Sequence, residues 1–129
     1  MNDVEYERER RRQIRLERLG TNNPKCLFCP ENDPGCLELH HVAGKRFGDE
    51  TVITCQNCHR KLTDKQKEHP PAIAAEVTTR ERRGRHLLGI ADGLELLNCR
   101  EQLVSLIRQT GLGLIEEGQL PNSTDGERP

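Results

Sequence analysis

Four of the six cysteines form two pairs with identical spacing. Two residues separate Cys26 from Cys29, and two separate Cys55 from Cys58. A two-residue spacer lets the backbone turn so that both thiolates of a pair reach one tetrahedral zinc ion at about 2.3 Å. A single pair would also fit a thiol oxidoreductase, but two pairs on either side of a predicted hairpin favour zinc over redox chemistry. The spacing therefore predicts a structural zinc site with four cysteine ligands.

Three histidines accompany these pairs. His40 and His41 lie in the alternating segment LELHHV, and His59 follows Cys58 directly. A hairpin between them would bring His59 back towards the first two, so that three imidazoles converge beside the zinc site. Imidazole binds metals and titrates near neutral pH, so it suits both metal ligation and general base catalysis. Glu38 lies two residues before His40 and so on the same strand face, where it is expected to support a bound metal indirectly.

Together, the segments CLFC, LELHHV and CQNCH resemble the HNH endonuclease family, whose ββα-metal core is often carried between two CxxC zinc knuckles. The resemblance covers residues 26 to about 68. It implies a DNA phosphodiester hydrolase that uses magnesium or another divalent cation, with His40 and His59 as ligands of that cation and His41 as the general base. The family's middle Asn falls at Glu50 in this sequence. Either a carboxylate of Asp49-Glu50 replaces the Asn by accepting a hydrogen bond from the base, or the site is weakened.

Phosphodiester hydrolysis is consistent with these residue types. A base near neutral pH takes a proton from the attacking water, and a divalent ion stabilises the negative charge on the phosphate and the leaving oxygen. Basic side chains on the predicted turn and helix would contact the phosphate backbone, which positions DNA without reading its sequence. These are Lys45, Arg46, Arg60 and Lys61. An ordinary solvated surface is the alternative for each of them.

The elements that would position these residues follow from periodicity and turn signals. We expect strands at 36–42 and 51–54, a tight turn at 44–48 between them, and a helix at 56–68. The fold class is therefore predicted as α+β, a small ββα-metal core stapled by the four-cysteine zinc site, with flanking N- and C-terminal helices. The predicted domains are a charged helix at 1–20, the nuclease core at 21–70, a helical extension at 71–120 and a disordered tail at 121–129.

Both flanking helices carry recognisable signals. Asn2 and Glu5 are spaced like a capping box, Gly20 is a stop, and the segment between them is expected to be a solvated helix with Glu and Arg pairs such as Glu7 with Arg11. This pattern is compatible with contact between the helix and DNA but does not demand it.

Near the C-terminus, apolar residues spaced three or four apart predict one amphipathic helix that ends near Gly111. They are Leu96, Cys99, Leu103 and Leu106. Cys99 would be a buried structural thiol on this stripe. The stripe is long for a small core, so part of it is expected to contact a second copy or another protein. Cys36 has no partner at knuckle spacing and is interpreted as a free or packed thiol.

The composition excludes further classes of function. Lys and Arg total 20 against 21 Asp and Glu, so the overall charge favours no partner class. With no Trp, one Tyr and two Phe, the chain lacks the aromatic platform of sequence-tolerant single-strand binders. The sequence shows no signal peptide or membrane-spanning stretch, so a cytoplasmic protein with reduced thiols is expected.

A second functional class also agrees with the sequence. The same fold with an impaired catalytic site would be a non-catalytic zinc-binding module that binds nucleic acid or a partner protein.

Overall fold

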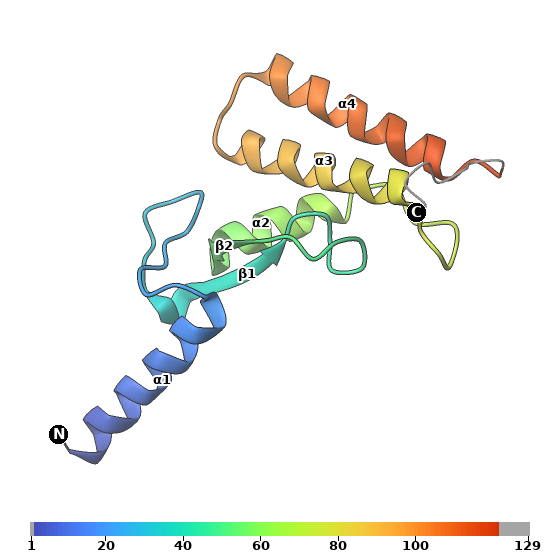
Figure 1. Cartoon of the computed structure of the whole chain (residues 1–129). Coiled ribbons are helices and arrows are strands. Elements are labelled where there is room, and N and C mark those ends of the chain that lie inside the picture. The colour runs from blue at the N-terminus through green and yellow to red at the C-terminus, as the bar shows by residue number, and fades with distance from the viewer. Residues whose placement is uncertain (1, 122–129) are drawn as a thin grey trace. The chain divides into compact units, whose positions relative to one another are not determined.

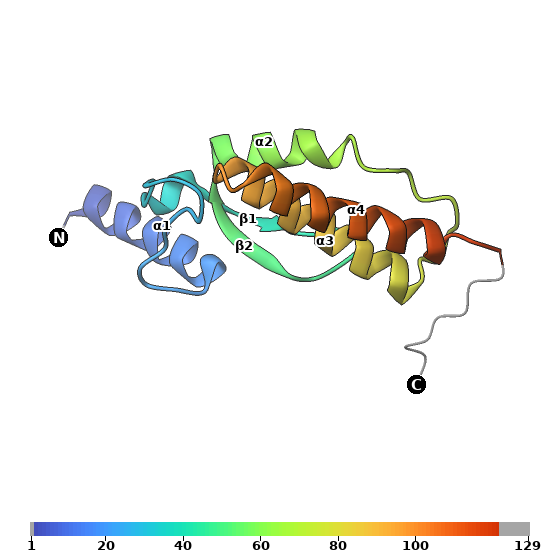
Figure 2. The same ribbon diagram turned by 90° about the horizontal axis from the view of Figure 1, so that it is seen from above.

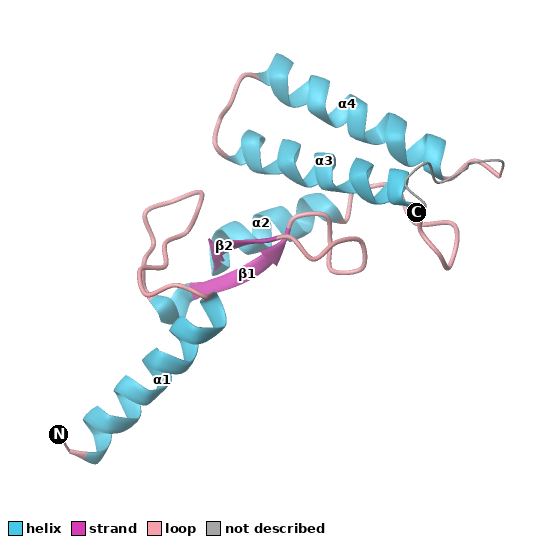
Figure 3. Cartoon of the chain, in the orientation of Figure 1, coloured by secondary structure: helices cyan, strands magenta, loops and turns pink. Residues whose placement is uncertain are grey.

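The computed structural model describes residues 2–121, and this part of the chain contains four α-helices, one short 3-10 helix and a two-stranded antiparallel sheet (Figures 1 and 3). The α+β class is confirmed. In chain order the elements are α1 (Asp3–Leu19), η1 (Pro34–Cys36), β1 (Leu37–His41), β2 (Thr51–Cys55), α2 (Gln56–Gln66), α3 (Thr79–Leu96) and α4 (Glu101–Gly118).

Two compact units make up the described chain. The first holds residues 2–40 and 52–60, and the second holds residues 41–51 and 61–121. The predicted nuclease core is therefore shared between the two units, because β1 and α2 each contribute residues to both. No helix within residues 2–121 combines the length and the apolar character that crossing a membrane requires.

In the first unit, α1 begins and ends as its sequence predicts. The Asn2 side chain accepts a hydrogen bond from the Glu5 backbone, the Glu5 side chain accepts one from the Asn2 backbone, and Gly20 closes the helix at φ 79°. A positive φ of this size favours glycine, which has no Cβ to clash. Buried Leu16 and Leu19 lie near the end of the helix, which packs against η1.

Ion pairs along α1 differ from the expected one. Glu7 pairs with Arg10 at 4.0 Å and Glu9 with Arg12 at 3.8 Å, so the pairs are three residues apart, and Glu7 does not pair with Arg11. All four side chains are about half exposed, so these pairs contribute little to stability.

The hairpin forms close to its predicted position. β1 and β2 lie within a residue of the predicted strands, and α2 follows β2 directly. The turn between them starts at Gly44, whose φ of 96° again favours glycine, and its N–H donates to the His41 carbonyl at 3.1 Å. Beyond the strand ends, the Val42 N–H donates to the Glu50 carbonyl at 3.0 Å.

In the second unit, α3 and α4 lie side by side as a helical hairpin (Figures 1 and 2). Glycines let the two backbones approach closely. A Cβ on Gly84 would lie 2.5 Å from the Gly111 carbonyl oxygen, and a Cβ on Gly111 would lie 2.7 Å from the Gly84 carbonyl oxygen. Leu88 on α3 and Ile115 on α4 are both buried. Small residues at the crossing therefore set the distance between these helices.

The predicted continuous helix through Leu96 and Leu106 is wrong. α3 ends at Leu96 and α4 begins only at Glu101, with Asn98 at φ 57° in the turn between them. Asn is among the few residues that adopt this left-handed conformation readily, and it turns the chain back on itself.

The leucines assigned to one stripe therefore sit on two helices. Leu103 and Leu106 are 47% and 66% exposed, while Val104 and Ile115 form the buried side of α4. Cys99 lies half-buried in the turn instead of on a buried helix face. A dimer or partner contact through this region stays a prediction.

A polar network connects three helices of the second unit. Buried Asp92 on α3 contacts His69 Nε2 at 2.8 Å and accepts a hydrogen bond from Arg108 of α4 at 3.1 Å. Glu95 accepts from Lys65 at 2.7 Å and from Arg108 at 2.6 Å. Lys65 and then Arg108 hold the pKa of Glu95 below its usual value. Since every charge in the network faces an opposite one, burying Asp92 is tolerated.

Candidate metal centre

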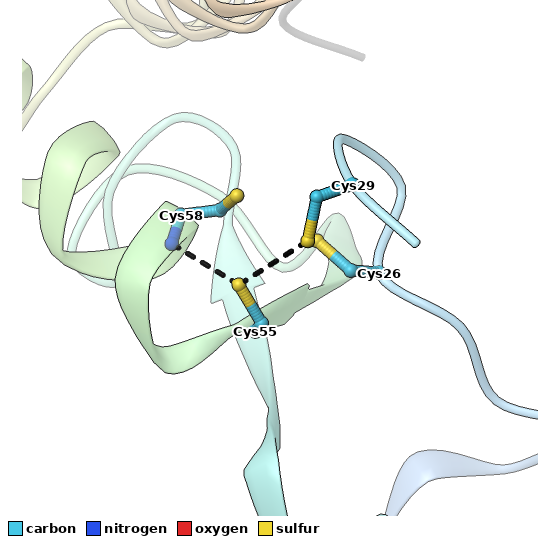
Figure 4. Close-up of side chains that lie close together, drawn as sticks. All are labelled: Cys26, Cys29, Cys55 and Cys58. Carbon is cyan, nitrogen blue, oxygen red and sulfur yellow. Dashed lines mark hydrogen bonds between the residues drawn. The ribbon is translucent and has the colours of Figure 1, made fainter. Parts of the chain in front are cut away.

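The four predicted cysteines meet at one point of the first unit. Their sulfur atoms all lie within 4.8 Å of one another, and this is the only group of three or more potential metal ligands of this kind among residues 2–121 (Figure 4). Cys26 and Cys29 come from the loop after α1, Cys55 ends β2, and Cys58 lies in the first turn of α2. The predicted cysteine cluster is confirmed.

Backbone hydrogen bonds explain why the two pairs meet. The Leu27 N–H donates to the Ile53 carbonyl of β2 at 3.0 Å, which fastens the first knuckle to the strand that carries the second. Within the knuckles, the Phe28 N–H donates to Cys26 Sγ at 3.4 Å and the Cys58 N–H to Cys55 Sγ at 3.3 Å. Figure 4 shows the second of these bonds beside the Cys29 to Cys55 contact.

This arrangement fits a zinc ion. Four sulfurs at about 2.3 Å from a tetrahedral centre lie roughly 3.8 Å from one another. The Sγ atoms of Cys29 and Cys55 are 3.5 Å apart, close to that value. Thiolate sulfur that accepts backbone N–H bonds is also the donor type of structural zinc sites. The four cysteines can therefore hold a metal such as zinc.

Burial opposes ionisation of these thiols. It raises the pKa of Cys58 far above its usual value, helped by hydrogen bonding to Cys55. Burial acts in the same direction on Cys26, but backbone hydrogen bonds from the Cys55, Phe28 and Cys29 segments outweigh it and lower its pKa to about 7. A cation at the centre of the cluster would favour the ionised form of all four sulfurs.

Cys36 is separate from the cluster, as its spacing predicts. Its sulfur lies 3.9 Å from the Asp33 carboxylate, and burial together with that negative charge raises the pKa of the thiol. Its sulfur is not among the four that lie within 4.8 Å of one another.

Two of the predicted histidines also lie together in the first unit. The ring centroids of His40 and His59 are 5.3 Å apart, and the rings meet edge to face at 73°. Ring nitrogens bound to one ion at about 2.1 Å would place the two centroids roughly 4.5 to 5.2 Å apart for bond angles between 90° and tetrahedral. The observed separation lies just above that range, and a cation shared by these two rings stays a prediction.

Glu38 supports this pair directly. Its Oε2 lies 2.5 Å from His59 Nδ1, and both side chains are partly exposed. A carboxylate on Nδ1 fixes the ring orientation and leaves Nε2 to face a metal, which is the usual arrangement around histidine ligands. His40 itself is only 4% exposed.

His41 is the next residue of β1, and it belongs to the second unit. Its carbonyl accepts hydrogen bonds from Gln66 Nε2 at 2.9 Å and from the Gly44 N–H at 3.1 Å, so its backbone is held from two sides. The ring itself is half-buried and makes no hydrogen bond to another residue within 2–121.

The Glu50 carboxylate makes no hydrogen bond to the His41 ring in the described part of the chain. It folds over Gly48 instead, where a Cβ would lie 2.9 Å from Glu50 Oε2. The backbone carbonyl of Glu50 accepts the Val42 N–H at 3.0 Å, which extends the strand pairing by one residue beyond β1 and β2. The catalytic role of Glu50 stays a prediction.

The four basic residues proposed to contact DNA are exposed, but they differ in their surroundings. The Arg46 guanidinium donates to the Ala74 and Ala75 carbonyls at 3.0 and 3.3 Å, so part of its donor capacity is already used. Lys45, Arg60 and Lys61 make no ion pair with another described residue. Their contact with DNA stays a prediction.

Sequence reasoning did not assign two arginines that the structure places beside the histidines. Arg15 and Arg18 of α1 line a hollow of about 510 Å³ together with Glu38 and His59. Their spacing of three residues predicts a shared helix face, but which other element that face meets depends on tertiary contacts.

Comparison of the chain with protein-family models, with curated proteins and with solved structures found no match.

Proposed function

We propose that this protein is a divalent-metal-dependent endonuclease that hydrolyses phosphodiester bonds in DNA, the activity implied by its resemblance to the HNH family. The observation that carries the proposal is the Glu38, His59 and His40 arrangement beside the cysteine cluster. A carboxylate that orients a histidine ring is the usual arrangement around histidine ligands of metal ions, and here it acts on one of two adjacent imidazoles.

Each residue then has a defined role. His40 and His59 would hold a divalent cation such as magnesium, with the Glu38 carboxylate accepting a hydrogen bond from the Nδ1–H of His59. The bound cation supplies a Lewis acid that stabilises charge on the phosphate and on the leaving oxygen. His41 takes the proton from the attacking water. The exposed Lys45, Arg46, Arg60 and Lys61 would contact DNA phosphates. Glu50 stands at the position of the family's Asn, although its carboxylate lies over Gly48 in this structure.

The cysteine cluster has a separate task in this proposal. A zinc ion bound by four thiolates has no open position for substrate, so it stabilises the fold and takes no part in the reaction. The protein has a small set of buried aliphatic side chains, and a bound metal ion adds stability that such a small core does not supply by itself.

The test is cleavage of supercoiled plasmid by the zinc-loaded protein with added Mg²⁺ or Mn²⁺. The control omits the divalent ion, because EDTA would also remove structural zinc and unfold the protein. Substitution Glu38→Gln should weaken Mn²⁺ affinity by about 10- to 100-fold without releasing zinc. Glu116→Gln, an exposed carboxylate on α4, is the matched control and should behave as wild type.

Absence of cleavage by folded, zinc-loaded protein with either ion would overturn the proposal. It would favour the second candidate, a non-catalytic zinc-binding module that binds nucleic acid or a partner protein. One observation supports this alternative: within residues 2–121 no side chain hydrogen-bonds the His41 ring, whereas a working general base is normally oriented by such a bond.

A further inference from the structure

The hollow beside His59 is built from three parts of the first unit. α1 contributes Arg15 and Arg18, the η1 and β1 segment contributes Gly35 and Glu38, and α2 contributes His59. Its volume of about 510 Å³ is open enough to admit part of a polymer backbone. The candidate metal ligand therefore shares its surroundings with two cations from a helix that the proposed function does not yet use.

Local packing fixes the end of α1 that carries the two arginines and places Arg15 against Gly35. The Arg15 guanidinium lies against Gly35, where an added Cβ would be 3.1 Å from Nη1 and 3.6 Å from Cζ. Leu16 and Leu19, which alternate with the arginines along α1, are 4% and 6% exposed. Because these leucines anchor the end of the helix, the positions of Arg15 and Arg18 on α1 are set on the side of the hollow that both residues line.

Their charge is not neutralised. Neither arginine forms an ion pair or a hydrogen bond with another side chain within residues 2–121, whereas Arg10 and Arg12 on the same helix pair with Glu7 and Glu9. The carboxylate in the hollow, Glu38, is already engaged by His59. Two guanidinium groups against one carboxylate leave a net positive charge in the hollow, which attracts an anion, and guanidinium groups match phosphate oxygens in geometry.

We propose that Arg15 and Arg18 bind backbone phosphates of the DNA strand that is cut at the site of His40 and His59, so that α1 forms part of the substrate-binding surface. This inference rests on the proposed nuclease function. Contacts of this kind position the duplex and read no base sequence. They also make affinity depend steeply on salt, because each neutralised phosphate releases counterions.

The experiment compares wild type with the double substitution Arg15→Gln and Arg18→Gln. Binding to a labelled DNA duplex is measured by fluorescence anisotropy between about 50 and 200 mM salt, without added divalent ion so that no cleavage occurs. Each lost phosphate contact reduces the slope of log K against log salt by about 0.9, so the double variant should lose about 1.8 of that slope. Plasmid cleavage with Mg²⁺ should fall in parallel.

The matched control is the double substitution Arg10→Gln and Arg12→Gln, which removes the same two charges from α1 but from residues that are paired with Glu7 and Glu9. It should keep the wild-type salt slope. An equal reduction of the salt slope in this control would mean that the total charge of the helix, and not the two arginines in the hollow, determines DNA binding. That result would overturn the inference. A double variant with lower thermal stability but the wild-type salt slope would also overturn it, because the arginines would then act on the fold alone.

The outcomes separate this inference from the proposed function. Cleavage by wild type together with an unchanged slope in the double variant overturns the role of the arginines and leaves the nuclease standing. No cleavage by wild type together with the reduced slope overturns the nuclease and leaves phosphate binding by Arg15 and Arg18 standing.

Discussion

Gly89 on α3 is a point where the structure leaves no room for any side chain. A Cβ at this position would lie 1.8 Å from the Val42 carbonyl oxygen and 2.7 Å from its carbonyl carbon. Carbon and carbonyl oxygen normally approach to about 3.3 Å, so Gly89→Ala requires a backbone displacement of roughly 1.5 Å. Because the obstacle is backbone, no rotamer change relieves it.

The cost follows from this displacement. Overpacking against a rigid neighbour costs about 3 kcal/mol, and the better helix propensity of Ala offsets about 1 kcal/mol of that. We expect a net loss of about 2 kcal/mol, which lowers Tm by roughly 8 °C for a chain of this size. Gly113→Ala is the control, since it has nothing within 4 Å of its added Cβ and should raise Tm by roughly 4 °C.

The assay is thermal unfolding of zinc-loaded protein followed by circular dichroism, with plasmid cleavage measured beside it. Val42 follows the proposed base His41, so displacing it should reduce cleavage by up to about 100-fold even below the melting temperature. A Gly89→Ala protein that melts at or above wild type would refute the reasoning, because the contact with Val42 would then not constrain the helix.

Three further predictions concern the site and the charges. Cys58→Ala should lose zinc and unfold, whereas Cys36→Ala should keep both zinc and fold, as a colorimetric zinc assay and circular dichroism would report. His41→Ala should keep zinc, fold and DNA binding but lose cleavage by about 10² to 10⁴, and a metal-free or unfolded variant would place His41 in the scaffold instead. Acid should weaken the fold as Glu95 protonates, because Lys65 lowers the pKa of Glu95 in the folded protein. The stability that Glu95 contributes is therefore present above its unfolded pKa near 4.5 and is lost as the pH falls through the lower folded pKa. Glu95→Gln should flatten that part of a curve of stability against pH.

Local features of the sequence were sufficient to predict the elements around the metal centre. The two knuckles were found because a Cys-x-x-Cys turn is a local geometry, and their convergence was inferred from the hairpin signal between them. Alternation at 36–42 and β-branched residues at 51–54 predicted both strands to within one residue at each end. Asn2 and Gly20 set the ends of α1 through capping and φ preferences that depend on neighbours in the chain.

Periodicity failed where two helices share one apolar pattern. The spacing of Leu96, Leu103 and Leu106 continues across the break, so the pattern alone does not reveal that the chain reverses at Asn98. A left-handed Asn is compatible with many contexts, and here the close approach of Gly84 and Gly111 makes a hairpin the better packed arrangement.

The remainder of the site depended on tertiary structure. Sequence spacing placed Glu38 on the same strand face as His40, but its bond to His59 required α2 to return beside β1. Arg15 and Arg18 were indistinguishable in sequence from the other arginines of α1, and only the packing of that helix against η1 directs them to the hollow beside His59. Contacts between residues distant in the chain depend on how apolar faces pack, and local preference determines the faces but not which of them meet.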